Sequence, residues 1–217
     1  MSETIITYSL DEKDVAIPMD RDEFYNEQIK AFKKNKQPTR AVEIVEIILV
    51  NERGEMIVQK RSGAKRHNPC LFDKSIGGHV QYGDSPDYTV MVETVQELQI
   101  PSIVLRNEDD FKKTYKLLFN YLNTTAIIKH IETKFCNLER IFDGEKIIIA
   151  NKKHTYIGIY AGAVKTVDRE AKGILFYNLE SLNKELKSFP DIFTNDLRLF
   201  MEEYGEEMEK FVKFIKN

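Results

Sequence analysis

The segment Gly77–Ile100 constrains this chain most, because a glycine pair leads through a short loop into a helix with acidic side chains on one face. Ser85 and Pro86 mark the start of that helix, since serine caps exposed amides and proline suits the first helical position. Glu93 and Glu97 are four residues apart, so they stack on one face. Hard divalent cations prefer clustered oxygen ligands of this kind. The pattern predicts a metal site, and a solvated helix face is the alternative.

The composition is that of an ordinary globular protein. At 217 residues the chain suits one large domain or two small ones, and it can bury roughly 70% of its unfolded surface without a disulfide or structural metal. The net charge of −3 gives no general argument for a nucleic acid polymer as partner. Cys70 and Cys136 lack the spacing of a ligand pair, which favours free thiols in a reducing compartment. We expect a cytoplasmic protein without a signal peptide or membrane span.

Apolar periodicity and turn residues divide the chain into helices and strands. Helices are predicted over residues 21–34, 108–132, 179–186 and 195–215, and a further helix starts at Ser85 and Pro86 and is ended by Pro101. Strands are predicted over residues 41–50, 55–60, 71–76, 146–150, 155–164 and 174–177, with a turn at residues 151–154. The buried stripe predicted for the second helix is Val90, Met91, Thr94, Val95 and Leu98. Because helices and strands do not alternate strictly, the pattern favours an α+β fold.

The segment that begins at Gly78 resembles the Nudix box, G-x5-E-x7-R-E-U-x-E-E-x-G-U, in which U is a bulky aliphatic residue. Its spacing is intact. Positions that carry the same or a similar side chain are Gly78, Asp84, Glu93, Glu97 and Ile100. The letters that differ are Asp84 for glutamate, Val92 for arginine, Gln96 for glutamate and Gln99 for glycine, and Thr94 is a weak aliphatic substitute.

Segments on both sides of the box extend the resemblance to a particular subgroup. They are residues 39–42, 54–62, 72–80 and 193–196, together with Lys65 and Pro69. This subgroup is similar in sequence to isopentenyl-diphosphate isomerase but consists mainly of hydrolases. The catalytic cysteine of the isomerase would fall at Gly77, and Cys70 lies too early to replace it. Isomerisation of isopentenyl diphosphate is therefore not expected.

The resemblance implies one Nudix domain over residues 1–217, with a mixed β-sheet core between helices. Residues 1–38 would form an N-terminal extension, and residues 107–145 a helical insertion after the box. Its implied activity is hydrolysis, with Mg²⁺ or Mn²⁺, of a nucleoside diphosphate derivative or another small organic diphosphate. A small-molecule diphosphate is then the expected partner, and the long helices are compatible with a homodimer.

The resemblance also implies roles for individual residues. Glu93 and Glu97 would be catalytic, and the metal ligands would be Gly78, Glu93, Gln96, Glu97 and the distal acid Glu170. The basic side chains that would bind phosphate oxygens are Lys60, Arg61, Lys65 and Arg66. Surface positions are the alternative for Gln96, for Glu170 and for the basic loop. His79 is interpreted as a structural hydrogen-bonding residue.

The altered letters of the box leave two functional classes open. Gln96 keeps an oxygen ligand but loses a negative charge, so we expect metal affinity to fall. Val92 removes the arginine that orients a box glutamate in the family, and a positioning error of about an ångström can cost roughly a hundredfold in rate. The chain is therefore expected to be a slow or specialised hydrolase, with a catalytically impaired diphosphate-binding or regulatory protein as the alternative.

Overall fold

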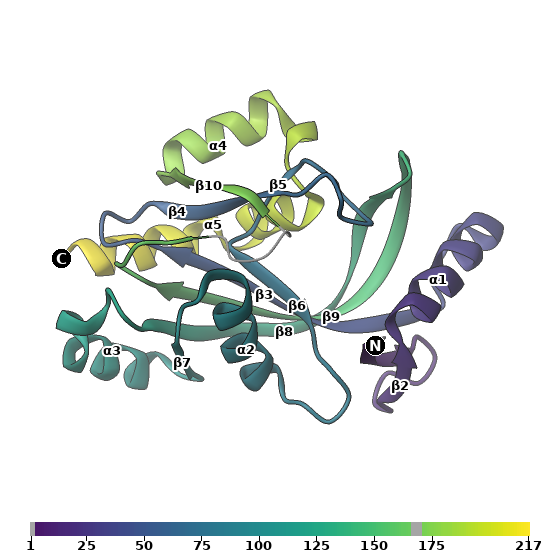
Figure 1. The fold of residues 1–217 in the computed structure, drawn as a ribbon, viewed down its shortest axis with the longest axis horizontal. Helices are drawn as coiled ribbons and strands as arrows, with labels where there is room; N and C mark the ends of the chain where they lie inside the picture. Colours follow the sequence, from purple (N-terminus) through teal and green to yellow (C-terminus); the bar gives the residue numbers. More distant parts are fainter. Residues whose placement is uncertain (1–2, 166–170) are drawn as a thin grey trace.

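A mixed β-sheet runs through the middle of the molecule, and helices cover both of its faces (Figure 1). The structure is a computed structural model that describes residues 3–165 and 171–217. Its strands are β1 (Thr4–Ser9), β2 (Ile17–Asp20), β3 (Arg40–Val50), β4 (Met56–Arg61), β5 (Phe72–Asp73), β6 (Ile76–His79), β7 (Ser102–Leu105), β8 (Ala126–Phe142), β9 (Glu145–Ile159) and β10 (Ala171–Tyr177). Its α-helices are α1 (Arg21–Asn35), α2 (Pro86–Leu98), α3 (Glu108–Leu117), α4 (Leu179–Ser188) and α5 (Asn195–Lys216). This mixture confirms the α+β fold class.

Strand β3 is the centre of the sheet. The main strand order is β10-β4-β3-β9-β8-β7, and β3 also pairs with β1 and β6. Its pairing with β9 is parallel and its pairing with β6 is antiparallel, so that Val45 lies opposite both His154 and Gly78. The glycine turn of β6 is therefore fixed against the middle of the most buried strand.

The two faces of β3 pack against different helices, as alternation of side chains along a strand requires. Val45, Ile47 and Leu49 share a core cluster with Val90 and Leu98 of α2. Ile48 and Val50 belong instead to the cluster formed by α3, α4 and α5. A third cluster joins α1 to the outer part of the β8–β9 hairpin. Helix α2 is thus anchored on one side of the sheet and α5 on the other.

The N-terminal residues are part of the sheet. Strand β1 pairs antiparallel with β3 and with β2, and α1 follows directly. Asp20 caps α1 by accepting hydrogen bonds from the backbone amides of Asp22 and Glu23. The segment described as an extension therefore contributes two strands and a helix to the fold.

The turn predicted at residues 151–154 is wrong, because β9 continues through it to Ile159. The polar side chains that suggested a turn are buried and meet acidic partners on β3. Lys153 Nζ lies 2.7 Å from Glu46 Oε2, and His154 Nε2 lies 2.6 Å from Glu43 Oε1. Buried charges are tolerated where they are paired, so these residues join β9 to β3.

The helix predicted over residues 108–132 is also only partly correct. Helix α3 ends at Leu117 and a short 3-10 turn follows at Phe119–Tyr121. From Ala126 the chain forms β8, which pairs antiparallel with β9 along nearly its whole length. The aromatic residues of α3 supplied the helical period, whereas the β-branched residues beyond residue 124 favour a strand. Residues 107–145 are therefore helical only at their start.

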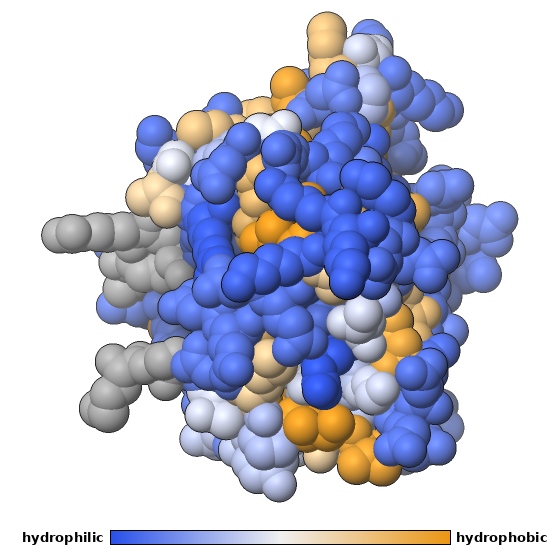
Figure 2. Space-filling model, turned by 90° about the vertical axis from the view of Figure 1, so that its right-hand side faces the viewer, coloured by the Kyte–Doolittle hydropathy of each residue, from blue (hydrophilic) through white to orange (hydrophobic). Residues whose placement is uncertain are grey.

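The hairpin of β8 and β9 reaches past the edge of β3 and turns at Asp143 and Gly144 (Figure 1). The face of the molecule on that side is mostly hydrophilic, and apolar side chains appear there in small separate areas (Figure 2). Among the described residues, no helix is both long and apolar enough to span a membrane. Helix α1 packs against the outer part of the hairpin and fixes the position of the hairpin relative to the sheet.

Candidate active site

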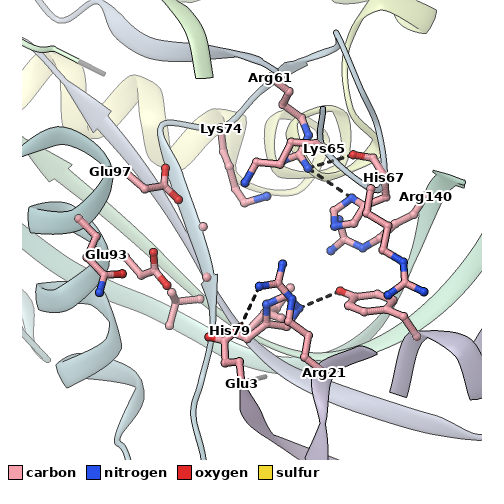
Figure 3. A pocket seen from close by; sticks show the side chains of 17 residues that line it. Glu3, Arg21, Arg61, Lys65, His67, Lys74, His79, Glu93, Glu97 and Arg140 are labelled. Carbon is pink, nitrogen blue, oxygen red and sulfur yellow. Dashed lines mark hydrogen bonds and ion pairs between the residues drawn. The ribbon is translucent and has the colours of Figure 1, made fainter. Parts of the chain in front are cut away.

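Helix α2 carries the two carboxylates that the sequence singled out. The Ser85 side chain accepts a hydrogen bond from the Tyr88 amide and caps the helix, as predicted. Val90, Thr94 and Leu98 are buried, but Met91 and Val95 of the predicted stripe are 39% and 49% exposed. With the helix turned this way, the side chains of Glu93 and Glu97 point from α2 toward β6 (Figure 3).

Glu93 packs directly against Gly78. A Cβ atom at residue 78 would lie only 1.9 Å from Glu93 Oε1, so any side chain there would displace this carboxylate. Pairing of β6 with β3 holds Gly78 opposite Val45 and prevents the strand from moving away. The glycine is required for close approach, and it brings the predicted carbonyl ligand beside a predicted carboxylate ligand.

Glu97 is held by Gln59, a residue that the sequence analysis did not select. Gln59 lies on β4, is buried, and donates a hydrogen bond from Nε2 to Glu97 Oε2 at 2.6 Å. The same amide group also donates to the Ser75 carbonyl oxygen. An amide that directly follows the apolar run Met56–Val58 of the strand was the available signal, because a buried amide needs partners.

Both carboxylates line a cavity of about 190 Å³ together with six basic side chains (Figure 3). The basic residues are Arg21, Arg61, Lys65, Arg66, Lys74 and Arg140. Three of them were predicted from the basic loop, and the other three were not. Gly78 and Gln96 also line the cavity, so most of the predicted site residues are brought together.

Two predicted residues do not belong to this group. The Lys60 ammonium lies 4.4 Å from the centre of the Phe72 ring, and Lys60 does not line the cavity. Alternation along β4 explains the difference, because Lys60 and Arg61 point to opposite faces of the sheet. Glu170 lies outside the described residues.

Several basic side chains are already engaged by nearby acids. Arg61 donates to Asp73 at 2.8 Å and also to the carbonyl oxygens of His67 and Asn68, which folds the basic loop onto β4. Lys74 lies 2.9 Å from Asp196 at the start of α5, and this pairing raises the pKa of Lys74 despite its burial. The loop and the first turn of α5 are thereby fixed around the cavity.

Two histidines in the cavity wall are neutral. Burial and nearby arginines lower the pKa of His67 and of His79 well below their usual value. His79 Nε2 lies 2.8 Å from the Tyr25 hydroxyl, in keeping with a structural hydrogen-bonding role. Neutral imidazoles leave the positive charge of this wall to its lysines and arginines.

The residues present fit a magnesium-type ion only with help from a ligand. Among the residues that the structure describes, no group of three or more histidine, cysteine, aspartate or glutamate side chains could hold a metal ion. The available donors are the carboxylates of Glu93 and Glu97, the Gly78 carbonyl oxygen and the Gln96 amide oxygen. Mg²⁺ is commonly bound by one or two carboxylates plus substrate phosphates and water, which this donor set matches.

Solved structures of other proteins resemble this chain. The protein DR0079 from Deinococcus radiodurans is 14% identical, with coverage of 81% of this chain and 83% of that one and a TM-score of 0.51. The MutT protein from Methanosarcina mazei is 19% identical, with coverage of 77% and 94% and the same TM-score. A Nudix-family hydrolase from Clostridium perfringens, at 16% identity and coverage of 78% and 97%, has a TM-score of 0.47.

Similarity to the Methanosarcina mazei structure shows that this chain has the fold of a MutT protein, which is the Nudix fold. The fold expected from the box is thereby confirmed. No protein-family model matches the sequence, and no curated protein matches it. Because identity with the two structures is below 20%, the likeness extends to the fold and does not establish the activity.

Proposed function

We propose that this protein is a Mg²⁺- or Mn²⁺-dependent hydrolase of a nucleoside diphosphate derivative or another small organic diphosphate. One observation carries the proposal. Within a MutT-type fold, the carboxylates of Glu93 and Glu97 face basic side chains across a single cavity. Carboxylates on one wall suit a cation, and cations on the other suit phosphate oxygens.

Each part of the cavity then has a role in the proposed reaction. Glu93, Glu97, the Gly78 carbonyl and Gln96 would hold the ion, which when bound lowers the pKa of water and offsets phosphate charge. One of the two carboxylates takes the proton of the attacking water. The water oxygen bonds to phosphorus while the bridging P–O bond breaks, and the leaving phosphate keeps that electron pair. Lys65 binds phosphate oxygens, whereas Arg61 positions the loop that carries it.

The test is a panel of organic diphosphates assayed with Mg²⁺ or Mn²⁺. We expect turnover of at least one member, and a loss of about a hundredfold or more in Glu97→Gln, which keeps the shape of the side chain but removes its negative charge and its ability to accept a proton. Lys60→Met serves as the matched control, because Lys60 contacts Phe72 outside the cavity. Absence of turnover with every member, or an unchanged rate in Glu97→Gln, contradicts the proposal.

A non-catalytic diphosphate-binding protein is the second candidate, and it is favoured by Val92 and Gln96. Calorimetry with Mg²⁺ and diphosphates separates the two functions, since binding without hydrolysis supports this second candidate. If the altered letters only weaken a hydrolase, the double variant Val92→Arg with Gln96→Glu should raise the rate. Val95→Arg is the control, because it places an arginine on the exposed face of the same helix.

The resemblance to the isopentenyl-diphosphate-isomerase-like subgroup supports a hydrolase and not an isomerase. Cys70 and Cys136 do not line the cavity, and burial raises the pKa of the Cys136 thiol to about 11. No conversion of isopentenyl diphosphate is expected.

Both cysteines are free thiols, which supports the proposed cytoplasmic location. A homodimer stays a prediction, to be measured as the mass in solution.

A further inference from the structure

The side of the cavity opposite Glu93 and Glu97 is built by Arg140 and His67 (Figure 3). Arg140 belongs to β8, in the outer part of the long hairpin. His67 belongs to the loop between β4 and β5. Residues 107–145 were expected to be an insertion after the box, so the outer hairpin adds a wall of its own to the site.

Arg140 is buried and incompletely bonded. Only 5% of this residue is exposed, and its guanidinium reaches Asp196 through two long hydrogen bonds of 3.3 and 3.4 Å. Within the described part of the chain, its Nε atom has no hydrogen-bond partner. A buried donor without an acceptor is costly. A ligand oxygen at the cavity wall would remove that cost.

The two residues of this wall are held in place by backbone contacts. The Asn68 side chain accepts a hydrogen bond from the Ile141 amide at 2.7 Å, and the Asn68 amide donates to the Ile141 carbonyl at 2.9 Å. Arg61 donates to the His67 carbonyl at 3.0 Å. The loop and the hairpin are thereby joined next to Arg140, and a preorganised wall loses little entropy when an anion binds.

The charge and the size of the cavity indicate which ligand would fit this wall. Its lining contains six basic side chains and three acidic ones, and two of those three are the predicted metal ligands. Asp73 and Asp196 pair with three of the six basic side chains, so basic groups still outnumber acidic ones. A volume of about 190 Å³ is below the roughly 300–1,000 Å³ of typical small-molecule sites. Because this volume also includes the carboxylate side, the part beside Arg140 suits a compact oxyanion, and an arginine fork is the preferred partner of phosphate.

We infer that Arg140 and His67 form a second phosphate subsite, so that the substrate is a diphosphate that carries a further phosphate group. The inference rests on the proposed function for the diphosphate end, but the subsite itself needs no metal. The outer hairpin would then determine substrate specificity, because it places Arg140 in the cavity wall.

Phosphate binding can be measured separately from hydrolysis. The full chain, in EDTA at pH 7, is titrated with inorganic phosphate while the ring signals of its four histidines are followed by NMR. His67→Gln identifies the signal of His67. We expect a saturable shift of that signal with one phosphate per chain, and a much weaker effect of acetate at equal concentration. No shift, or an equal effect of acetate, overturns the phosphate subsite.

Arginine variants locate the binding. Arg140→Met should weaken phosphate binding by about tenfold or more, the cost of losing a hydrogen bond to a charged group. Arg140→Lys keeps the positive charge but loses the planar guanidinium, so its phosphate affinity should lie between those of the wild type and Arg140→Met. Arg198→Met is the matched control, because Arg198 Nε too has no hydrogen-bond partner among the described residues, whereas Arg198 does not line the cavity. Thermal melting reports whether each variant is folded.

The outcomes separate this inference from the proposed function. Phosphate binding that Arg140→Met removes, in a protein that hydrolyses no diphosphate, supports the subsite and contradicts the hydrolase. If the protein hydrolyses a diphosphate but does not bind inorganic phosphate in EDTA, the phosphate subsite is contradicted and the proposed hydrolase is not. If Arg140→Met does not fold, the wild-type titration and Arg140→Lys still decide, since phosphate binding that is unchanged in Arg140→Lys would exclude recognition by the arginine fork.

Discussion

Gly78 and Glu93 allow a test of the site at the scale of one methyl group. Gly78→Ala adds a Cβ atom where Glu93 Oε1 now lies, and the flexible end of Glu93 can move away. We therefore expect a small change in stability but a large loss of function. Mn²⁺ affinity and turnover should fall by about a hundredfold, as for a misplaced catalytic group. Metal titration and assays at saturating substrate measure both.

Gly173→Ala is the control for that substitution, because in the described part of the chain no atom beyond the two neighbouring residues lies within 4 Å of the Cβ it would create. It should leave metal affinity and turnover unchanged. Equal losses in both variants would mean that the effect at residue 78 is a general response of the strands to alanine. An unchanged Gly78→Ala variant would mean that Glu93 does not act from its position beside Gly78.

Gln59 tests whether a partner outside the box orients Glu97. Gln59→Leu removes the 2.6 Å hydrogen bond to Glu97 while keeping a side chain of similar size in the buried position. Loss of a group that orients a metal ligand typically costs about 10- to 100-fold in metal affinity or activity, and we expect a loss in that range. Gln81→Leu, at an exposed position, is the control. Equal Mn²⁺ affinity in Gln59→Leu and wild type would show that Glu97 needs no such support.

At the scale of the helix, α2 ends at a residue that replaces the glycine of the family signature. Gln99 has a φ of +57°, in the left-handed region, and its amide bonds back to the carbonyls of Thr94 and Val95. Glycine adopts this conformation without the steric cost of a Cβ. Gln99→Gly should raise the free energy of unfolding by about 0.5–1 kcal/mol. Urea denaturation measures it, and a destabilised variant would contradict this account.

The elements differ in how far the sequence predicts them, and the reason is the range of the contacts involved. Helix α2 follows from Ser85, Pro86 and its own apolar period, all of which are local. Strand β9 does not, because Lys153 suggests a turn until its partner Glu46 is placed beside it. These two residues are more than 100 positions apart, so their pairing depends on the completed sheet.

The same distinction explains the candidate site as a whole. Gly78 lies on β6, and Glu93 and Glu97 lie on the helix that follows it, so their approach could be predicted from spacing. Arg140 reaches the cavity from the outer hairpin, and Asp196 of α5, which pairs with both Lys74 and Arg140, is also remote in the sequence. The predicted metal ligands therefore come from one continuous segment of the sequence. The basic side chains of the cavity come from distant segments that only the folded chain brings together.

The whole molecule should lose stability in mild acid because of two histidines. His67 and His79 are buried with pKa values well below normal, so the native state stays unprotonated where the unfolded chain takes up protons. Their contribution is complete above pH 6.5 and is lost as the pH falls toward their native pKa values. Each can contribute up to about 1.4 kcal/mol per pH unit in this range.

Urea denaturation at several pH values between 7 and 5 measures this dependence. The free energy of unfolding should fall steadily with pH in the wild type, and the slope should be smaller in His79→Gln, which can keep a hydrogen bond to Tyr25. The pH range from 7 to 5 avoids any contribution from the titration of Asp73 and Asp196. Their lowered pKa values place their effect on stability below about pH 4. A flat profile in the wild type would mean that these imidazoles become protonated in the native cavity, where they would then add to its positive charge.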